Sequence, residues 1–73
     1  MIGEYYIAID VEQFEIAVDM IERGLWFRET DLHIYDNETL VTTEKFVMES
    51  VTSYFRYIGI SYSVQRRPHF MEN

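Results

Sequence analysis

The sequence predicts a single small α+β domain whose elements follow the order βαββαβ. Three observations indicate this class. Two stretches have the apolar spacing of an amphipathic helix, and a glycine follows each of them. Short stretches rich in β-branched and aromatic residues flank both helices. The chain has only 73 residues, and a chain of that size buries about 60% of its unfolded surface, which is enough for one core.

The first strand and helix are predicted over residues 5–9 and 11–23. Residues 5–9 read Tyr-Tyr-Ile-Ala-Ile, a composition typical of a strand. Asp10 is expected to be the N-cap, and Gln13 completes a capping-box pattern. Gly24 is expected just past the helix, where a positive φ carries no steric cost for glycine. The side of this helix that is predicted to be buried consists of Phe14, Ala17, Val18 and Ile21. Ile16 and Met20 are expected to broaden this buried side.

A β-hairpin is predicted in the middle of the chain. Residues 32–35 alternate and form the expected second strand. Residues 36–38, Asp-Asn-Glu, have side chains that favour a tight turn, and residues 39–41 would pair back as a third strand. An alternative stays open, in which Asn37 caps an early helix and residues 38–43 are helical.

The second helix is predicted to start at a threonine cap and to run to about residue 58. Either Thr42 or Thr43 is the expected cap. If it is Thr42, Val41 and Phe46 are spaced to form a hydrophobic staple. The predicted buried side and the glycine stop of this helix are Val47, Val51, Tyr54, Phe55, Ile58 and Gly59.

The last strand is predicted over residues 60–65, which alternate apolar and polar residues in strict period two. Pro68 cannot donate to a ladder, so residues 66–68 are expected to end the strand. The domain is therefore expected over residues 1–68, with a tail over residues 69–73.

This order of elements is typical of a ferredoxin-like sandwich, with two helices on one face of a four-stranded antiparallel sheet. Alternation along the strands assigns the two faces of that sheet. The residues expected to meet the helices are Ile7, Ile9, Leu32, Ile34, Tyr62 and Val64. The residues expected on the open face are Tyr6, Ala8, His33, Tyr35, Ser61 and Ser63.

The charge is negative and unevenly distributed. Thirteen acidic residues against six basic ones give a formal charge of −7. Residues 1–22 contain six acids and no base, so the molecule is expected to have an acidic end. The expected basic end consists of Arg56, Arg66, Arg67 and His69. A field of this overall sign repels phosphate backbones, which disfavours direct binding of nucleic acid and favours a basic protein partner.

The compartment is expected to be the cytoplasm. The sequence has no cysteine, which fits a reducing environment. No apolar run approaches the roughly 18 residues of a membrane span, and the N-terminus lacks the basic region of a secretion signal.

The most distinctive surface feature is a row of carboxylates on the first helix, which we call the acidic row. Its spacing of i, i+3, i+7 and i+10 places the four side chains along one edge of the helix. The simpler interpretation is a solvated outer face. The functional interpretation is a partner-binding surface, because carboxylates about 5 to 6 Å apart on a helix resemble a row of phosphates. The acidic row consists of Glu12, Glu15, Asp19 and Glu22.

The open sheet face suggests a second kind of surface. Tyr6, His33 and Tyr35 are expected there among small residues. Aromatic residues on such a sheet stack bases in RNA-recognition domains, but the motif and the charge needed for that function are missing here. The better interpretation is a face that is partly exposed or that pairs with a second copy of the chain.

No catalytic or metal-binding pattern is found. His33 and His69 lack a ligand-spaced partner. The serines lack a nucleophile elbow, and the three glycines form no phosphate-binding loop. We therefore expect no enzyme activity, no metal and no cofactor.

These observations predict a small acidic protein-binding module. In size, charge and lack of catalytic motifs, the chain is similar to the small acidic proteins with which phages block host enzymes, some of which imitate DNA. The expected partner is then a basic surface of a host protein that handles nucleic acid. The alternative is a homodimeric ferredoxin-like module that is regulatory or binds a small effector through its open sheet face.

Overall fold

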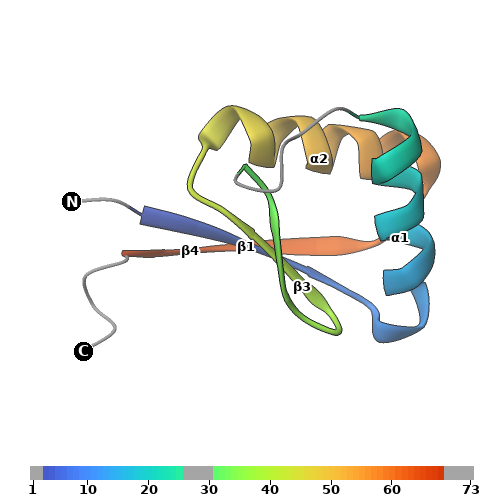
Figure 1. Ribbon diagram of the computed structural model, residues 1–73, viewed down its shortest axis with the longest axis horizontal. Coiled ribbons are helices and arrows are strands. Elements are labelled where there is room, and N and C mark those ends of the chain that lie inside the picture. Colours follow the sequence, from blue (N-terminus) through green and yellow to red (C-terminus); the bar gives the residue numbers. More distant parts are fainter. Residues whose placement is uncertain (1–2, 26–30, 69–73) are drawn as a thin grey trace.

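The computed structural model of the chain describes residues 3–25 and 31–68 (Figure 1). It contains two helices and a four-stranded antiparallel sheet, as the sequence predicts. The predicted tail, residues 69–73, lies outside the described residues. The elements in chain order are β1 (Gly3–Ile9), α1 (Val11–Gly24), β2 (His33–Asp36), β3 (Thr39–Thr42), α2 (Lys45–Ile58) and β4 (Tyr62–Pro68).

The sheet has the strand order β2-β3-β1-β4, and all neighbouring strands are antiparallel. β1 is central and pairs along its whole length with β4, from Gly3 opposite Pro68 to Ile9 opposite Tyr62. Two antiparallel steps separate β1 from β2, so these strands run parallel with β3 between them. β3 and β4 are related in the same way across β1. Each helix therefore connects two parallel strands that are not neighbours.

Both helices lie on the same side of the sheet (Figure 1) and share one core with its central strands. α2 packs over β1 and β3. Its residues Val47, Val51 and Phe55 are completely buried. The whole core cluster is Ile7, Ile9, Phe14, Ala17, Ile21, Leu40, Val47, Val51 and Phe55.

The predicted sheet faces are correct at the centre of the sheet and less so at its edges. Leu32 and Tyr62 pack against the core as expected. Ile34 is paired with the buried Leu40 but is 61% exposed, and Val64 is also exposed. The reason is that β2 and β4 are edge strands, whereas α2 covers the two central strands.

The predicted hairpin is present, and residues 39–42 form β3 rather than an early helix. The turn between β2 and β3 is held by Asp36, whose carboxylate accepts a hydrogen bond from the Glu38 backbone N–H at 2.9 Å. The pairing of β2 with β3 shifts register between Ile34 and Asp36, which marks a β-bulge at this edge.

The start of α1 differs from the prediction in its capping. Asp10 is the N-cap, but its side chain forms no capping hydrogen bond with the described residues. The Gln13 N–H donates to the backbone oxygen of Asp10 at 2.9 Å instead. The side-chain oxygen of Gln13 is buried with no hydrogen-bond partner in the described part of the chain. The expected capping box is therefore not formed.

The expected role of Gly24 is also wrong. Gly24 is the last residue of α1, and the helix ends because Leu25 is extended. Among the described residues, Gly59 alone has a positive φ. A Cβ on Gly24 would collide with the hydroxyl of Tyr54 in α2, which donates to the backbone oxygen of Met20 at 3.2 Å. Gly24 thus gives space to the end of the Tyr54 side chain, which packs against α1.

The cap of α2 lies one residue after Thr43 and two after Thr42, the two expected caps. Glu44 is the N-cap, and its side chain forms no capping bond with described residues. The buried Thr42 hydroxyl accepts a bond from the Glu44 N–H at 3.1 Å and donates to the Asp31 carbonyl at 2.5 Å. The predicted staple is not formed, because Val41 shares the sheet face of Tyr6 and Phe46 is exposed.

The last strand, predicted over residues 60–65, begins two residues later and ends three residues later than expected. β4 continues through Arg66 and Arg67 to Pro68. A proline is tolerated there because it stands at the end of an edge strand, where its missing N–H costs no internal bond of the sheet.

Replacing Phe55 by alanine should destabilise the fold severely. Its side chain is 0% exposed, and removing a buried phenylalanine costs about 3–5 kcal/mol. Phe46→Ala is the matched control, because Phe46 lies in the same helix and is 61% exposed. Its unfolding free energy in urea should stay within about 0.5 kcal/mol of the parent. Equal effects of the two substitutions would contradict the described core.

Replacing Gly59 by alanine should cost about 1–2 kcal/mol of unfolding free energy, since Gly59 has φ 84° and an L-residue is strained there. A Cβ added to Gly59 would have no atom within 4 Å, so the cost is conformational only. Gly59→Asn should lose less stability, because asparagine tolerates this conformation better. Thermal melts of the three proteins check the order, and an alanine variant as stable as the parent would refute it.

Candidate protein-binding surfaces

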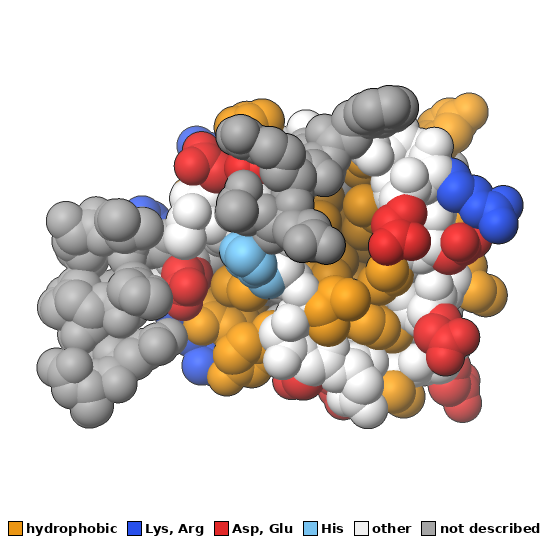
Figure 2. Space-filling model, in the orientation of Figure 1, with side chains coloured by type: hydrophobic (Ala, Val, Ile, Leu, Met, Phe, Trp, Pro, Cys, Tyr) orange, Lys and Arg blue, Asp and Glu red, His pale blue; other side chains and the backbone are white. Residues whose placement is uncertain are grey.

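The structure places all four carboxylates of the acidic row on the exposed side of α1. At about 100° per residue, they lie within an arc of about 80° and span about 15 Å along the helix axis. Acidic side chains line the edge of the molecule formed by α1 (Figure 2). The row is therefore a continuous surface feature.

The acidic row has few interactions with the rest of the chain. Asp19 forms an ion pair with Arg23 at 3.2 Å, and both side chains are largely exposed. Such an exposed pair contributes little to stability. The side-chain carboxylates of Glu12, Glu15 and Glu22 form no hydrogen bond or ion pair with the part of the chain that the structure describes. Three of the four carboxylates are thus available to a partner.

Tertiary structure extends the acidic surface beyond α1. The Ile9 N–H donates to the Glu38 carbonyl at 2.7 Å, which docks the turn between β2 and β3 beside the start of α1. The exposed Glu38 therefore adds a carboxylate group beside Asp10 at the start of α1, whereas the Asp36 side chain lies on the open sheet face. Sequence reasoning missed this group, because the hairpin and the helix are far apart in the chain and no local pattern connects them.

The basic side chains lie at the opposite end of the sheet. Arg66 and Arg67 in β4 pair with the first half of β1, whereas α1 begins just after its end. In Figure 1 the start of β1 and the end of β4 are on the left and α1 is on the right. Arg56 does not belong to this basic end, because it donates to the Tyr62 hydroxyl at 3.0 Å, at the start of β4. His69 lies outside the described residues.

The open sheet face brings together the three residues predicted for it. Tyr6 and Tyr35 contact each other edge to face, with ring centroids 5.2 Å apart and an interplanar angle of 84°. His33 is in register with Val41, which is paired with Tyr6. The Arg67 guanidinium lies 5.0 Å from the centre of the Tyr6 ring. These contacts leave Tyr6 only 8% exposed, whereas Tyr35 is 61% exposed.

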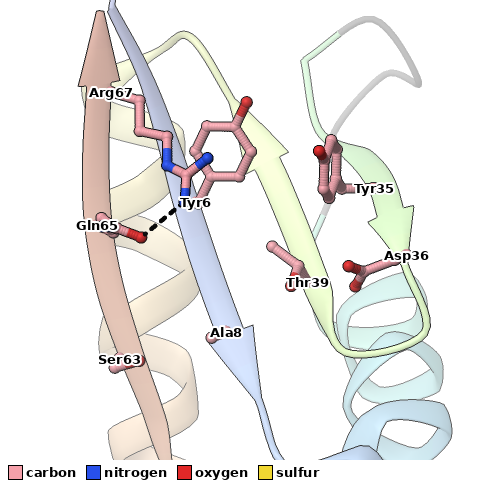
Figure 3. A pocket seen from close by; sticks show the side chains of 8 residues that line it. All are labelled: Tyr6, Ala8, Tyr35, Asp36, Thr39, Ser63, Gln65 and Arg67. Atoms are coloured by element: carbon pink, nitrogen blue, oxygen red, sulfur yellow. Dashed lines mark hydrogen bonds between the residues drawn. The ribbon is translucent and has the colours of Figure 1, made fainter.

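A shallow hollow of about 260 Å³ lies on this face (Figure 3). It forms where the small residues Ala8 and Ser63 are paired between larger neighbours. The Arg67 guanidinium donates to the side-chain oxygen of Gln65 at 3.4 Å along one side. The polar groups that line the hollow can form hydrogen bonds with a small molecule. Binding of a small effector at this face therefore stays a prediction. The lining residues are Tyr6, Ala8, Tyr35, Asp36, Thr39, Ser63, Gln65 and Arg67.

Two features are absent from the described residues. No group of three or more histidine, cysteine, aspartate or glutamate side chains there is placed to hold a metal ion. Neither described helix has the length and apolarity needed to cross a membrane.

Comparison with known proteins gave no match: no protein-family model fits the sequence, and neither curated proteins nor solved structures show significant similarity to the chain.

Proposed function

We propose that this protein acts by binding another protein, and that the acidic row contacts a basic surface of that partner. The observation that carries this proposal is the exposure of four carboxylates along one side of α1, three of them with no interaction among the described residues. Like charges at i+3 and i+4 destabilise a helix by a few tenths of a kcal/mol each. The row therefore lowers the stability of the free chain slightly, and a basic partner would relieve this repulsion.

The spacing of the row supports a partner that handles nucleic acid. Over about 15 Å the row holds four negative charges, whereas one DNA strand carries a phosphate about every 3.4 Å and so about four or five over that length. A full duplex carries about twice as many charges over the same length. The row thus corresponds to a short stretch of one strand, and we propose inhibition of the partner by occupation of its phosphate-binding surface.

The charge distribution of the whole molecule is compatible with this mode of binding. Arg66 and Arg67 lie at the far end of the sheet, beside Tyr5 and Tyr6. They therefore do not neutralise the row. Glu38, in the turn between β2 and β3, adds negative charge at the start of α1 and extends the field that would attract a basic protein.

We also propose that the fold is of the ferredoxin-like class. The strand order read from the other edge is β4-β1-β3-β2, and each helix connects two parallel strands with a third strand between them, as in a split βαβ unit. Such a scaffold uses its helices and one sheet face to form the core, so the outer sides of the helices are available for binding.

Charge reversal in the acidic row should abolish partner binding without unfolding the chain. The test captures proteins from lysate of the source cells with the intact chain, and then measures the affinity of each captured protein with purified components. Glu15→Lys should weaken binding by about tenfold or more, because it replaces an attraction by a repulsion. Reversal of all four carboxylates should abolish it. Binding of the parent chain should also weaken steeply as salt is raised.

Glu44→Lys is the matched control, because it makes the same change in net charge at an exposed position outside the row. Its affinity should stay close to that of the parent. The captured protein should also bind DNA in competition with the chain. Equal losses for the two single variants, or binding indifferent to salt, would refute the proposal.

A further inference from the structure

The outer side of α2 carries a stripe of four residues, which we call the outer α2 stripe. It consists of Phe46, Ser50, Ser53 and Tyr57. Their spacing of i, i+4, i+7 and i+11 places them within an arc of about 60°, opposite the buried side of the helix. Phe46 is 61% exposed and Tyr57 is 86% exposed. Two aromatic side chains therefore lie on the face of α2 that the core of the same chain cannot use.

We propose that a second copy of the chain binds this stripe through its own α2, with the two helices antiparallel. The stripe is self-complementary in that orientation, because its large residues stand at the ends and its small residues at the middle. Phe46 of one copy would lie opposite Tyr57 of the other, and Ser50 opposite Ser53. This is the reciprocal pattern that a twofold interface requires.

The size pattern also fits the way in which helices cross. Two packed helices are closest where they cross and move apart toward their ends. Ser50 and Ser53 at the middle allow the two backbones to come close. Phe46 and Tyr57 can fill the wider space at the ends, and aromatic residues are the side chains that contribute most at interfaces.

Charge complementarity points to the same occupant. Glu49 and Arg56 are exposed and lie on the same flank of the stripe. In an antiparallel pair, equivalent flanks face each other, so Glu49 of each copy would lie near Arg56 of the other. Arg56 is already held beside the stripe, because it donates to the Ser53 hydroxyl at 3.3 Å and to the Tyr62 hydroxyl at 3.0 Å.

The other flank of the stripe is occupied by the chain itself. Tyr54 lies there and contacts α1 through its bond to the Met20 backbone. The acidic row is on the side of α1 away from this contact, so pairing through α2 leaves the row accessible. The contact is limited to one helix of 14 residues per copy, so its area falls in the range of weak interfaces, below about 1,200 Å². Association should therefore be weak and dependent on concentration.

Sedimentation velocity over a wide range of protein concentration tests the proposal. The parent chain should form a dimer at high concentration. Phe46→Ser and Tyr57→Ser should each remove it, whereas Ile34→Ser should not, although Ile34 is as exposed as Phe46. Circular dichroism checks that each variant remains folded.

A charge swap tests the orientation of the two helices. Glu49→Arg and Arg56→Glu should each weaken the dimer by about tenfold, because symmetry changes two pairs at once. The double variant should recover the parent affinity. A parallel arrangement, or a role of Arg56 limited to its own chain, predicts no recovery and would overturn the antiparallel arrangement.

Cysteine cross-linking separates this interface from a dimer through the open sheet face. The chain has no cysteine, so a single substitution reports one position. Because Ser50 of one copy would lie opposite Ser53 of the other, a mixture of Ser50→Cys and Ser53→Cys chains should form a disulfide heterodimer rapidly under mild oxidation. Ser63→Cys on the open face should not cross-link. A chain that stays monomeric at all concentrations, or that cross-links through Ser63→Cys, would overturn the proposal. The oligomeric state and the cross-linking are measured with variants outside the acidic row. A failure of the dimer proposal therefore leaves the proposed function untouched, and the reverse also holds.

Discussion

The structure depends on the burial of one side of α2 against the two central strands. Val47, Val51 and Phe55 are completely buried and meet Ile7 of β1 and Leu40 of β3. In a chain of 73 residues there is material for one such core. The outer sides of the helices, much of the edge strands and part of the open sheet face are left to solvent or to partners.

The three surfaces of interest follow from this division. The acidic row lies on α1 away from α2, and the outer α2 stripe lies opposite the core. The open sheet face has no helix over it, and the chain covers part of it with its own side chains, since Arg67 lies over Tyr6 and Tyr35 contacts the same ring. This difference explains why we assign binding to the two helices: their exposed side chains have few internal contacts, whereas those of the sheet face have several.

The two glycines after the helical patterns show what local sequence can and cannot predict. Gly59 has the positive φ expected of a glycine stop. Gly24 has the same local context, but it ends α1 in helical conformation and gives space to Tyr54 from a distant helix. Likewise Thr42, expected as a helix cap, bonds to the Asp31 carbonyl across the chain. In each case a tertiary contact replaces the local role.

The sequence alone determined the order of the elements, the central buried residues of each helix and the exposure of the acidic row, but the expected burial of Ile16 is wrong, since Ile16 is 60% exposed. These follow from periodicity, which is a local property of a few consecutive turns or strand residues. Only the tertiary structure decided which acids join the row, where Arg56 lies and which strands become edges. Hydrogen bonds such as that from the Ile9 N–H to the Glu38 carbonyl connect segments that are far apart in the sequence. No periodic pattern in the sequence relates such segments. The positions of these side chains relative to one another depend on how the helices and strands pack together. The sequence of a single helix or strand does not specify that packing.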